Sequence, residues 1–108
     1  MADTKYILRY LPLFYADLEE KLLYITEKLH NITAANELID EVERAILKRL
    51  PFAESFEKYN SIKERRYPYY RIYVKNFIIY YVVIDDECEQ KIMEVRRLLY
   101  NKQNKKIV

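Results

Sequence analysis

The spacing of apolar residues changes from two to three or four and back along the chain, and this change limits the fold more than any other feature. Lys5–Leu11 alternates in the manner of a strand. Residues 13–29 then place apolar side chains three or four positions apart, as do residues 34–50, which predicts two amphipathic helices. Later, Tyr69–Lys75 and Phe77–Ile84 are rich in β-branched and aromatic residues, which favour strands.

Short connecting segments set the order of these elements. Pro12 suits the first turn of a helix, and Pro51 closes the second helix. The break at residues 30–33 is so short that the two helices should form an antiparallel hairpin. Asn31 or Thr33 is the expected cap of the second helix.

The second half of the chain is expected to be strands joined by turns. Residues 52–62 have no clean period and predict a loop. Lys75-Asn76 separates two strands, and asparagine tolerates the positive φ that a tight hairpin turn requires. The acidic stretch Asp85–Gln90 predicts a further turn before a last strand at Ile92–Leu99.

The resulting order is β-α-α-β-β-β, which predicts an α+β fold. The helix hairpin should pack on one face of a mainly antiparallel four-stranded sheet and leave the other face free as a working surface. At 108 residues the chain is expected to form one domain over residues 5–104, followed by a basic tail at 105–108.

The composition excludes several classes of chemistry. His30 is the only histidine and Cys88 the only cysteine, so neither a zinc cluster nor a Ser-His triad is expected. With no glycine, the chain has no Gly-rich phosphate loop. We therefore expect no metal and no cofactor. No apolar run approaches the roughly 18 residues of a membrane span, and no signal pattern begins the chain, which predicts a cytoplasmic protein that does not enter membranes.

The charge is concentrated at the C-terminal end. The net charge is only +2, yet residues 91–108 hold six Lys or Arg and one Glu. This distribution suggests a local contact with an anion, although a solvated basic tail would look the same. In the last strand, Arg97 shares a face with Met93 and Val95, and Arg96 lies on the other face. A guanidinium among apolar residues indicates either an anion site at the strand end or an ion pair with a helix carboxylate.

Tyrosines alternate with cations in the second predicted strand. Tyr69, Arg71, Tyr73 and Lys75 share one face, and Lys63, Arg65 and Arg66 lie just before it. This pattern suits RNA, because cations meet phosphates while rings stack on bases. An exposed sheet face of no special function is the alternative, since tyrosine is also a favoured strand residue.

Two other features have an ordinary interpretation beside the functional one. Tyr100 precedes Lys102 and could act as a general acid or base, or it could simply cover the edge of the core. The acids of residues 85–89 could bind a cation, or form a solvated turn. Cys88 lies among these acids, which disfavour a thiolate, so no nucleophilic role is expected.

Several motifs, taken in order, resemble the RelE/ParE toxin superfamily over roughly residues 5–104. Tyr10–Leu18 is similar to the N-terminal pattern of the family, in which a strand and a small linker are followed by a helix that contains Asp-Leu. Tyr24-Ile25 with Ala34-Ala35 resembles its helix pattern, and Leu50-Pro51 its helix end. The segment 94–104 resembles the family's C-terminal motif, which contains Arg and Leu.

The resemblance implies the toxin of a type II toxin–antitoxin pair, neutralised by a bound antitoxin. Some relatives cleave mRNA on the ribosome and others poison DNA gyrase. Arg97 falls on the family's last-strand arginine, and Tyr100 on a C-terminal His/Tyr position. We therefore expect a metal-independent endoribonuclease in which Arg97 and Arg71 contact the phosphate and Tyr100 assists proton transfer. Its RNA contacts are expected at Arg65, Arg66, Tyr69, Tyr73, Lys75, Arg96 and Lys102.

The sequence departs from the nuclease pattern at two places. Ile78 stands where many of the ribonucleases carry an arginine, and Asn101 replaces the C-terminal glycine. These departures keep two alternatives open. One is a non-enzymatic inhibitor of gyrase, and the other is a non-toxic interaction domain with the same fold.

Overall fold

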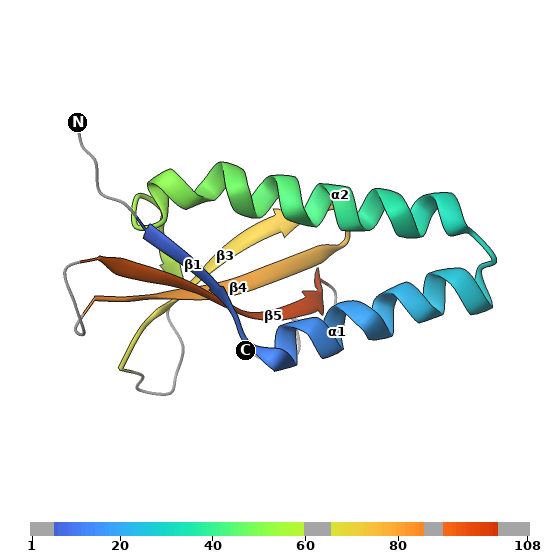
Figure 1. The fold of residues 1–108 in the computed structure, drawn as a ribbon, viewed down its shortest axis with the longest axis horizontal. Helices are drawn as coiled ribbons and strands as arrows, with labels where there is room; N and C mark the ends of the chain where they lie inside the picture. The colour runs from blue at the N-terminus through green and yellow to red at the C-terminus, as the bar shows by residue number, and fades with distance from the viewer. Residues whose placement is uncertain (1–5, 60–65, 86–89, 102–108) are drawn as a thin grey trace.

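Two helices lie along a five-stranded mixed sheet in the computed structural model (Figure 1). The structure describes residues 6–59, 66–85 and 90–101. The strands are β1 (Tyr6–Tyr10), β2 (Lys58–Tyr59), β3 (Tyr69–Val74), β4 (Phe77–Ile84) and β5 (Lys91–Tyr100). The helices are α1 (Pro12–Leu23) and α2 (Ile32–Arg49), with a π-helical turn η1 (Tyr24–Lys28) and a 3-10 turn η2 (Leu50–Phe52).

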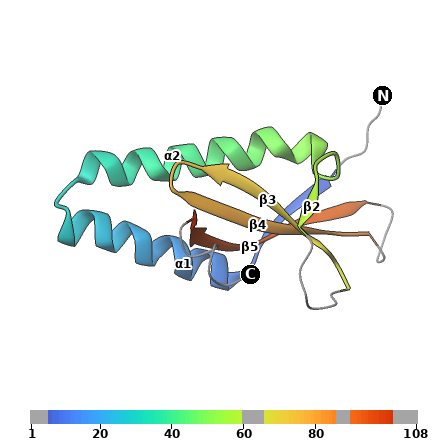
Figure 2. The same cartoon turned by 180° about the vertical axis from the view of Figure 1, so that it is seen from behind.

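The sheet confirms the α+β class and corrects the number of strands. Its order is β1-β5-β4-β3-β2, with β1 parallel to β5 and every other pair antiparallel. The four-stranded prediction is wrong because β2 lies in the segment expected to be a loop. Figure 2 shows β2 beside β3 at the edge of the sheet. A strand of two residues is too short for its side chains to show a period of two.

The helix hairpin forms where the sequence predicts it. Pro12 occupies the first turn of α1, and the Asn31 side chain caps α2 by accepting a hydrogen bond from the Ala34 N–H at 3.0 Å. α1 ends at Leu23 and passes into η1, where the Thr26 hydroxyl donates to the Leu22 carbonyl at 3.0 Å. The joined end of the hairpin projects beyond the sheet (Figure 1).

The main core lies between the helices and one face of the sheet. From the helices, Phe14, Leu38, Val42 and Ile46 are buried there. From the sheet come alternate residues of β3 and β4, and residues of β5 on both sides of a bulge: Tyr70, Ile72, Val74, Phe77, Ile79, Tyr81, Val83, Met93, Val95 and Leu98. Burying this much apolar surface is the main contribution to the stability of the fold.

The face of the sheet opposite the helices, here called the far face, is only partly open. A second, smaller cluster of Val82, Ile84 and Ile92 lies there, with Tyr67 and Tyr69 packed against it. Every residue of β4 is therefore buried. The expectation of a fully free second face is wrong in this region, and the accessible part lies beside β4.

The β3–β4 hairpin turns at the predicted dipeptide, but the unusual backbone angle falls on its first residue. Lys75 has a φ of 54°, whereas the sequence favoured Asn76 for that conformation. The Asn76 carbonyl instead accepts a hydrogen bond from the Asn101 N–H at 2.7 Å. The turn is thereby tied to the end of β5.

Candidate functional site

Arg71, Tyr80 and Arg97 form a row across three neighbouring strands of the far face. Arg71 of β3 lies opposite Tyr80 of β4, and Tyr80 lies opposite Arg97 of β5. Neighbouring strands are about 4.8 Å apart, so the two arginine backbones are about 10 Å from each other. The register therefore brings two of the predicted site residues into one row, with a tyrosine between them that the sequence did not single out.

Three further tyrosines lie beside this row, and together with Tyr80 we call them the tyrosine strip: Tyr59, Tyr69, Tyr73 and Tyr80. The rings of Tyr59 and Tyr69 stand edge-on to the ring of Tyr80, with centroid distances of 6.1 and 5.8 Å. Tyr80 is buried and forms the floor, while Tyr73 is 58% exposed. Tyr59 was missed from the sequence because it lies in the segment read as a loop.

Arg71 sits between two rings of the tyrosine strip. Its guanidinium carbon is 4.4 Å from the Tyr59 ring centroid and 5.8 Å from that of Tyr73. Within residues 6–59, 66–85 and 90–101, no carboxylate pairs with this guanidinium. A half-buried cation that is held by ring faces, and that pairs with no carboxylate of the described residues, is suited to receive an anion.

Burial keeps the floor of the tyrosine strip protonated. Burial and the neighbouring Tyr59 raise the pKa of Tyr80, and the nearby positive charge of Arg71 lowers it by less. The Tyr80 hydroxyl is therefore a hydrogen-bond donor at neutral pH and not a base.

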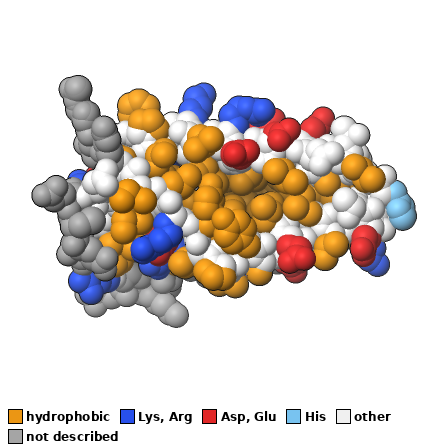
Figure 3. Space-filling model, viewed as in Figure 1, with side chains coloured by type: hydrophobic (Ala, Val, Ile, Leu, Met, Phe, Trp, Pro, Cys, Tyr) orange, Lys and Arg blue, Asp and Glu red, His pale blue; other side chains and the backbone are white. Residues whose placement is uncertain are grey.

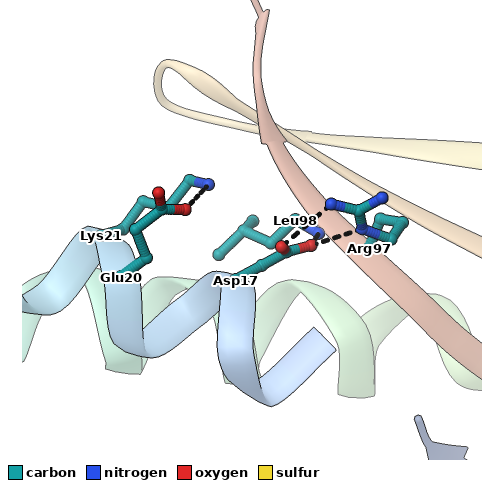
Figure 4. Close-up of polar contacts among 5 residues, drawn as sticks. All are labelled: Asp17, Glu20, Lys21, Arg97 and Leu98. Atoms are coloured by element: carbon teal, nitrogen blue, oxygen red, sulfur yellow. Dashed lines mark hydrogen bonds and ion pairs between the residues drawn. The ribbon is translucent and has the colours of Figure 1, made fainter. Parts of the chain in front are cut away.

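Arg97 is held by a carboxylate of α1. Its Nε and one terminal nitrogen donate to the two oxygens of Asp17 at 2.7 and 3.1 Å (Figure 4). Although burial raises the pKa of Asp17, the hydrogen bonds from Arg97 and from the Leu98 N–H lower it by more. The structure thus has the ion pair with a helix carboxylate, which was one of the two interpretations of Arg97.

The position of Asp17 follows from where β1 ends. The Leu11 N–H makes the last bond from this segment to β5, donating to the Val95 carbonyl at 3.0 Å. Beyond that point, no strand among the described residues pairs with β5 on this side. The Asp17 carboxylate takes the place of a neighbouring strand by accepting the Leu98 N–H at 2.9 Å. The position of Asp17 between the apolar residues of the first helix predicts that it faces solvent, yet it lies on the buried face with Phe14 and Lys21.

A second charged cluster lies on the far face around Glu94. The Arg9 guanidinium donates twice to one oxygen of Glu94, at 2.9 and 2.7 Å, and Arg96 Nε donates to the other at 2.8 Å. Burial raises the pKa of Glu94, but these bonds lower it by more. Two arginines share one carboxylate, so the cluster keeps a net positive charge. Arg96 occupies a β-bulge and lies 5.9 Å from the Tyr69 ring centroid. The bulge shifts the alternation of β5, so that Arg97 lies on the far face. The prediction that Arg97 shares a face with Met93 and Val95 is therefore wrong, because both of those residues lie in the main core.

Tyr100 lies on the helix side of the sheet, opposite to the face that carries Arg71. Its ring packs on Phe77 at a centroid distance of 4.9 Å, and the buried Lys21 ammonium lies 5.1 Å from its centroid. Burial raises the pKa of Tyr100. Arg71, Arg97 and Tyr100 therefore do not meet in one site.

The remaining predicted contacts are scattered. Lys75 is exposed in the hairpin turn, and the exposed Arg66 lies 5.4 Å from the ring centroid of its neighbour Tyr67. Arg66 also lines a pocket of about 320 Å³, together with Lys58, Glu54 and Asp85. Arg65, Lys102 and most of the acidic stretch, including Cys88, lie outside the described residues.

Comparison with known proteins does not assign the site. The chain matches no family model and no curated protein sequence. In the described part of the chain, no group of three or more His, Cys, Asp or Glu side chains could hold a metal ion. None of the helices there is long and apolar enough to cross a membrane.

Proposed function

We propose that this protein is the toxin of a type II toxin–antitoxin pair and that it inhibits growth by cleaving mRNA on the ribosome. The observation that carries the proposal is the position of the Arg71 guanidinium between tyrosine rings on an accessible part of the sheet. Among the residues that the structure describes, no carboxylate pairs with it. Cations interleaved with aromatic rings bind single-stranded RNA through phosphates and base faces.

Arg71 supplies the electrostatic part of this chemistry. In RNA cleavage the ribose 2′-hydroxyl gives up its proton to water and its oxygen attacks the adjacent phosphorus, while negative charge grows on the phosphoryl oxygens. The bond from phosphorus to the 5′-oxygen of the next nucleotide then breaks, and that oxygen takes a proton from water, which leaves a 2′,3′-cyclic phosphate and a 5′-hydroxyl. A guanidinium that is already fixed by two rings stabilises this charge with little reorganisation. Arg97 lies about 10 Å across the sheet by strand spacing and contributes positive potential, while its main bonds go to Asp17.

A bound antitoxin would have two surfaces to cover. One is the positive far face around Arg71 and the Arg9–Glu94–Arg96 cluster, which suits acidic residues. The other is apolar, because hydrophobic side chains gather between the two helices (Figure 3). Exposed residues on these helices include Leu13, Tyr15, Leu23, Ile32, Ile39 and Leu47. Exposed apolar surface of this extent is typical of a protein that binds a partner.

The test is to incubate purified protein with translating ribosomes and a defined message, and to map new 5′ ends by primer extension. We expect cuts within the message at the ribosome. Intact message at a protein concentration above that of the ribosomes would contradict the proposal. Unchanged growth on expression of the chain alone would favour a non-toxic interaction domain.

The Asp17–Arg97 pair favours a second candidate, a non-enzymatic inhibitor of DNA gyrase. The arginine that the resemblance assigns to phosphate contact is occupied by a carboxylate, and Ile78 is fully buried where a nuclease arginine is expected. A supercoiling assay with purified gyrase separates the two candidates. Unaffected gyrase at high protein concentration removes this alternative.

A further inference from the structure

The far face carries positive charge at two separated places with aromatic rings between them. At one end Arg71 lies between the rings of Tyr59 and Tyr73. At the other end Arg96 lies 5.9 Å from the Tyr69 ring and shares Glu94 with Arg9. Tyr80 connects the two ends, because both Tyr59 and Tyr69 stand edge-on to it.

We infer that the tyrosine strip binds unpaired RNA by itself, without the ribosome, with base stacking on Tyr73 and phosphate contacts at Arg71 and at the Arg9–Arg96 pair. The inference rests on the proposed function in taking RNA as the target. It adds that affinity for the message resides in this chain and that an unpaired strand is the form recognised.

The exposure of the rings determines what can stack. Tyr73 is 58% exposed at the accessible side of β3, whereas Tyr80 is 6% exposed and is covered by its neighbours. A base can therefore reach the Tyr73 ring without disturbing the core. The bases of an A-form duplex are stacked on one another and cannot offer their faces to a protein ring, so stacking favours an unpaired strand.

The charges at the two ends determine how the strand is held. The Arg71 guanidinium has no described carboxylate partner. The Arg9 and Arg96 side chains, 48% and 28% exposed, share a single buried acid and so retain one net positive charge. A strand whose base stacks on Tyr73 would bring a neighbouring phosphate to Arg71, and a phosphate further along the strand to the Arg9–Arg96 pair. Each such contact makes the affinity depend on salt, with a slope of about 0.7 per phosphate for a single strand.

The experiment measures the fluorescence anisotropy of a short labelled oligouridine with the full chain and no ribosomes, beside a duplex RNA of equal length. We expect the single strand to bind more tightly. Tyr73→Leu should weaken this binding roughly 5- to 100-fold, which is the usual contribution of one stacked base. Tyr24→Leu is the matched control, because Tyr24 is 49% exposed on the helix hairpin. Arg71→Gln should lower the slope of log affinity against log salt by about 0.7.

Each other outcome has a definite meaning. Equal binding of duplex and single strand, or equal effects of Tyr73→Leu and Tyr24→Leu, would overturn the inference. If polyglutamate displaces the RNA while Tyr73→Leu leaves RNA affinity unchanged, the face docks an acidic protein and the inference is wrong. RNA binding without ribosomal cleavage leaves this inference standing and removes the proposed nuclease. Ribosomal cleavage without binding of free RNA would overturn this inference and leave the proposed nuclease standing.

Discussion

Asp17 and Arg97 are 80 positions apart in the chain and are joined by two hydrogen bonds of 2.7 and 3.1 Å. The same carboxylate also accepts the Leu98 N–H, so one side chain of α1 completes the edge of β5 where β1 has ended. The side chain of Asp17 is 8% exposed and that of Arg97 is 37% exposed. This contact joins the first helix to the last strand, and it limits the freedom of Arg97 to act on an RNA phosphate.

Removing this carboxylate should destabilise the fold. Asp17→Ala leaves the Leu98 N–H unsatisfied and Arg97 without its partner, for an expected loss of roughly 2–4 kcal/mol of unfolding free energy, given the partial exposure of Arg97. Urea denaturation measures the loss. The control is Glu41→Ala, which breaks an exposed pair with Arg44 and should cost less than about 1 kcal/mol. Equal losses in the two variants would show that the Asp17 contacts do not stabilise the protein.

Stability should fall as the pH falls through the acid range. The folded-state pKa values of Asp17 and Glu94 lie below their ordinary values of 3.8 and 4.5, because their arginine partners outweigh burial. The unfolded chain therefore binds more protons than the folded chain in this range. The contribution is fully present well above pH 4.5 and is lost as the pH falls through the folded values.

Urea midpoints measured between neutral pH and pH 3 would test this dependence. We expect a decline that begins near pH 5 and is shallower in Glu94→Gln, because one of the acids with a lowered pKa no longer titrates. Identical pH profiles for wild type and Glu94→Gln would contradict the assignment of this titration to Glu94.

A buried hydroxyl near the end of α2 gives a separate test of the packing. The Tyr81 hydroxyl donates to the Ala53 carbonyl at 2.7 Å and accepts from Arg49 at 3.0 Å. Tyr81→Phe keeps the ring but leaves the Ala53 carbonyl without this donor, so we expect a loss of about 1–3 kcal/mol. Tyr73→Phe, at a residue that is 58% exposed, is the control for thermal or urea unfolding. A Tyr81→Phe protein as stable as wild type would show that the Tyr81 contacts are not formed.

The sequence predicts the helices and the long strands because each repeats one period over many residues. It does not predict β2, whose two residues carry no period. It also misplaces Asp17, because a carboxylate in an amphipathic helix normally faces solvent. Only the approach of β5 explains its burial, and that approach depends on contacts between distant parts of the chain.

The sequence predicts only the part of the candidate site that lies within one strand. Arg71 and Tyr73 were singled out because both lie on one strand, where alternation alone places them on one face. Tyr59 and Tyr80 join them only through the pairing of neighbouring strands. The resemblance groups Tyr100 with the arginines, yet pairing with Phe77 places it on the other face.

The rate at which Arg71→Ala cleaves a message on purified ribosomes tests the central proposal most directly. Loss of one preorganised donor to a transition state typically slows a reaction about 100- to 1000-fold, so we expect a decrease of that order. Arg44→Ala, at a 64% exposed arginine on α2, should cleave at the wild-type rate. Cleavage by Arg71→Ala as fast as by Arg44→Ala would show that Arg71 and the surface around it are not the site of the reaction.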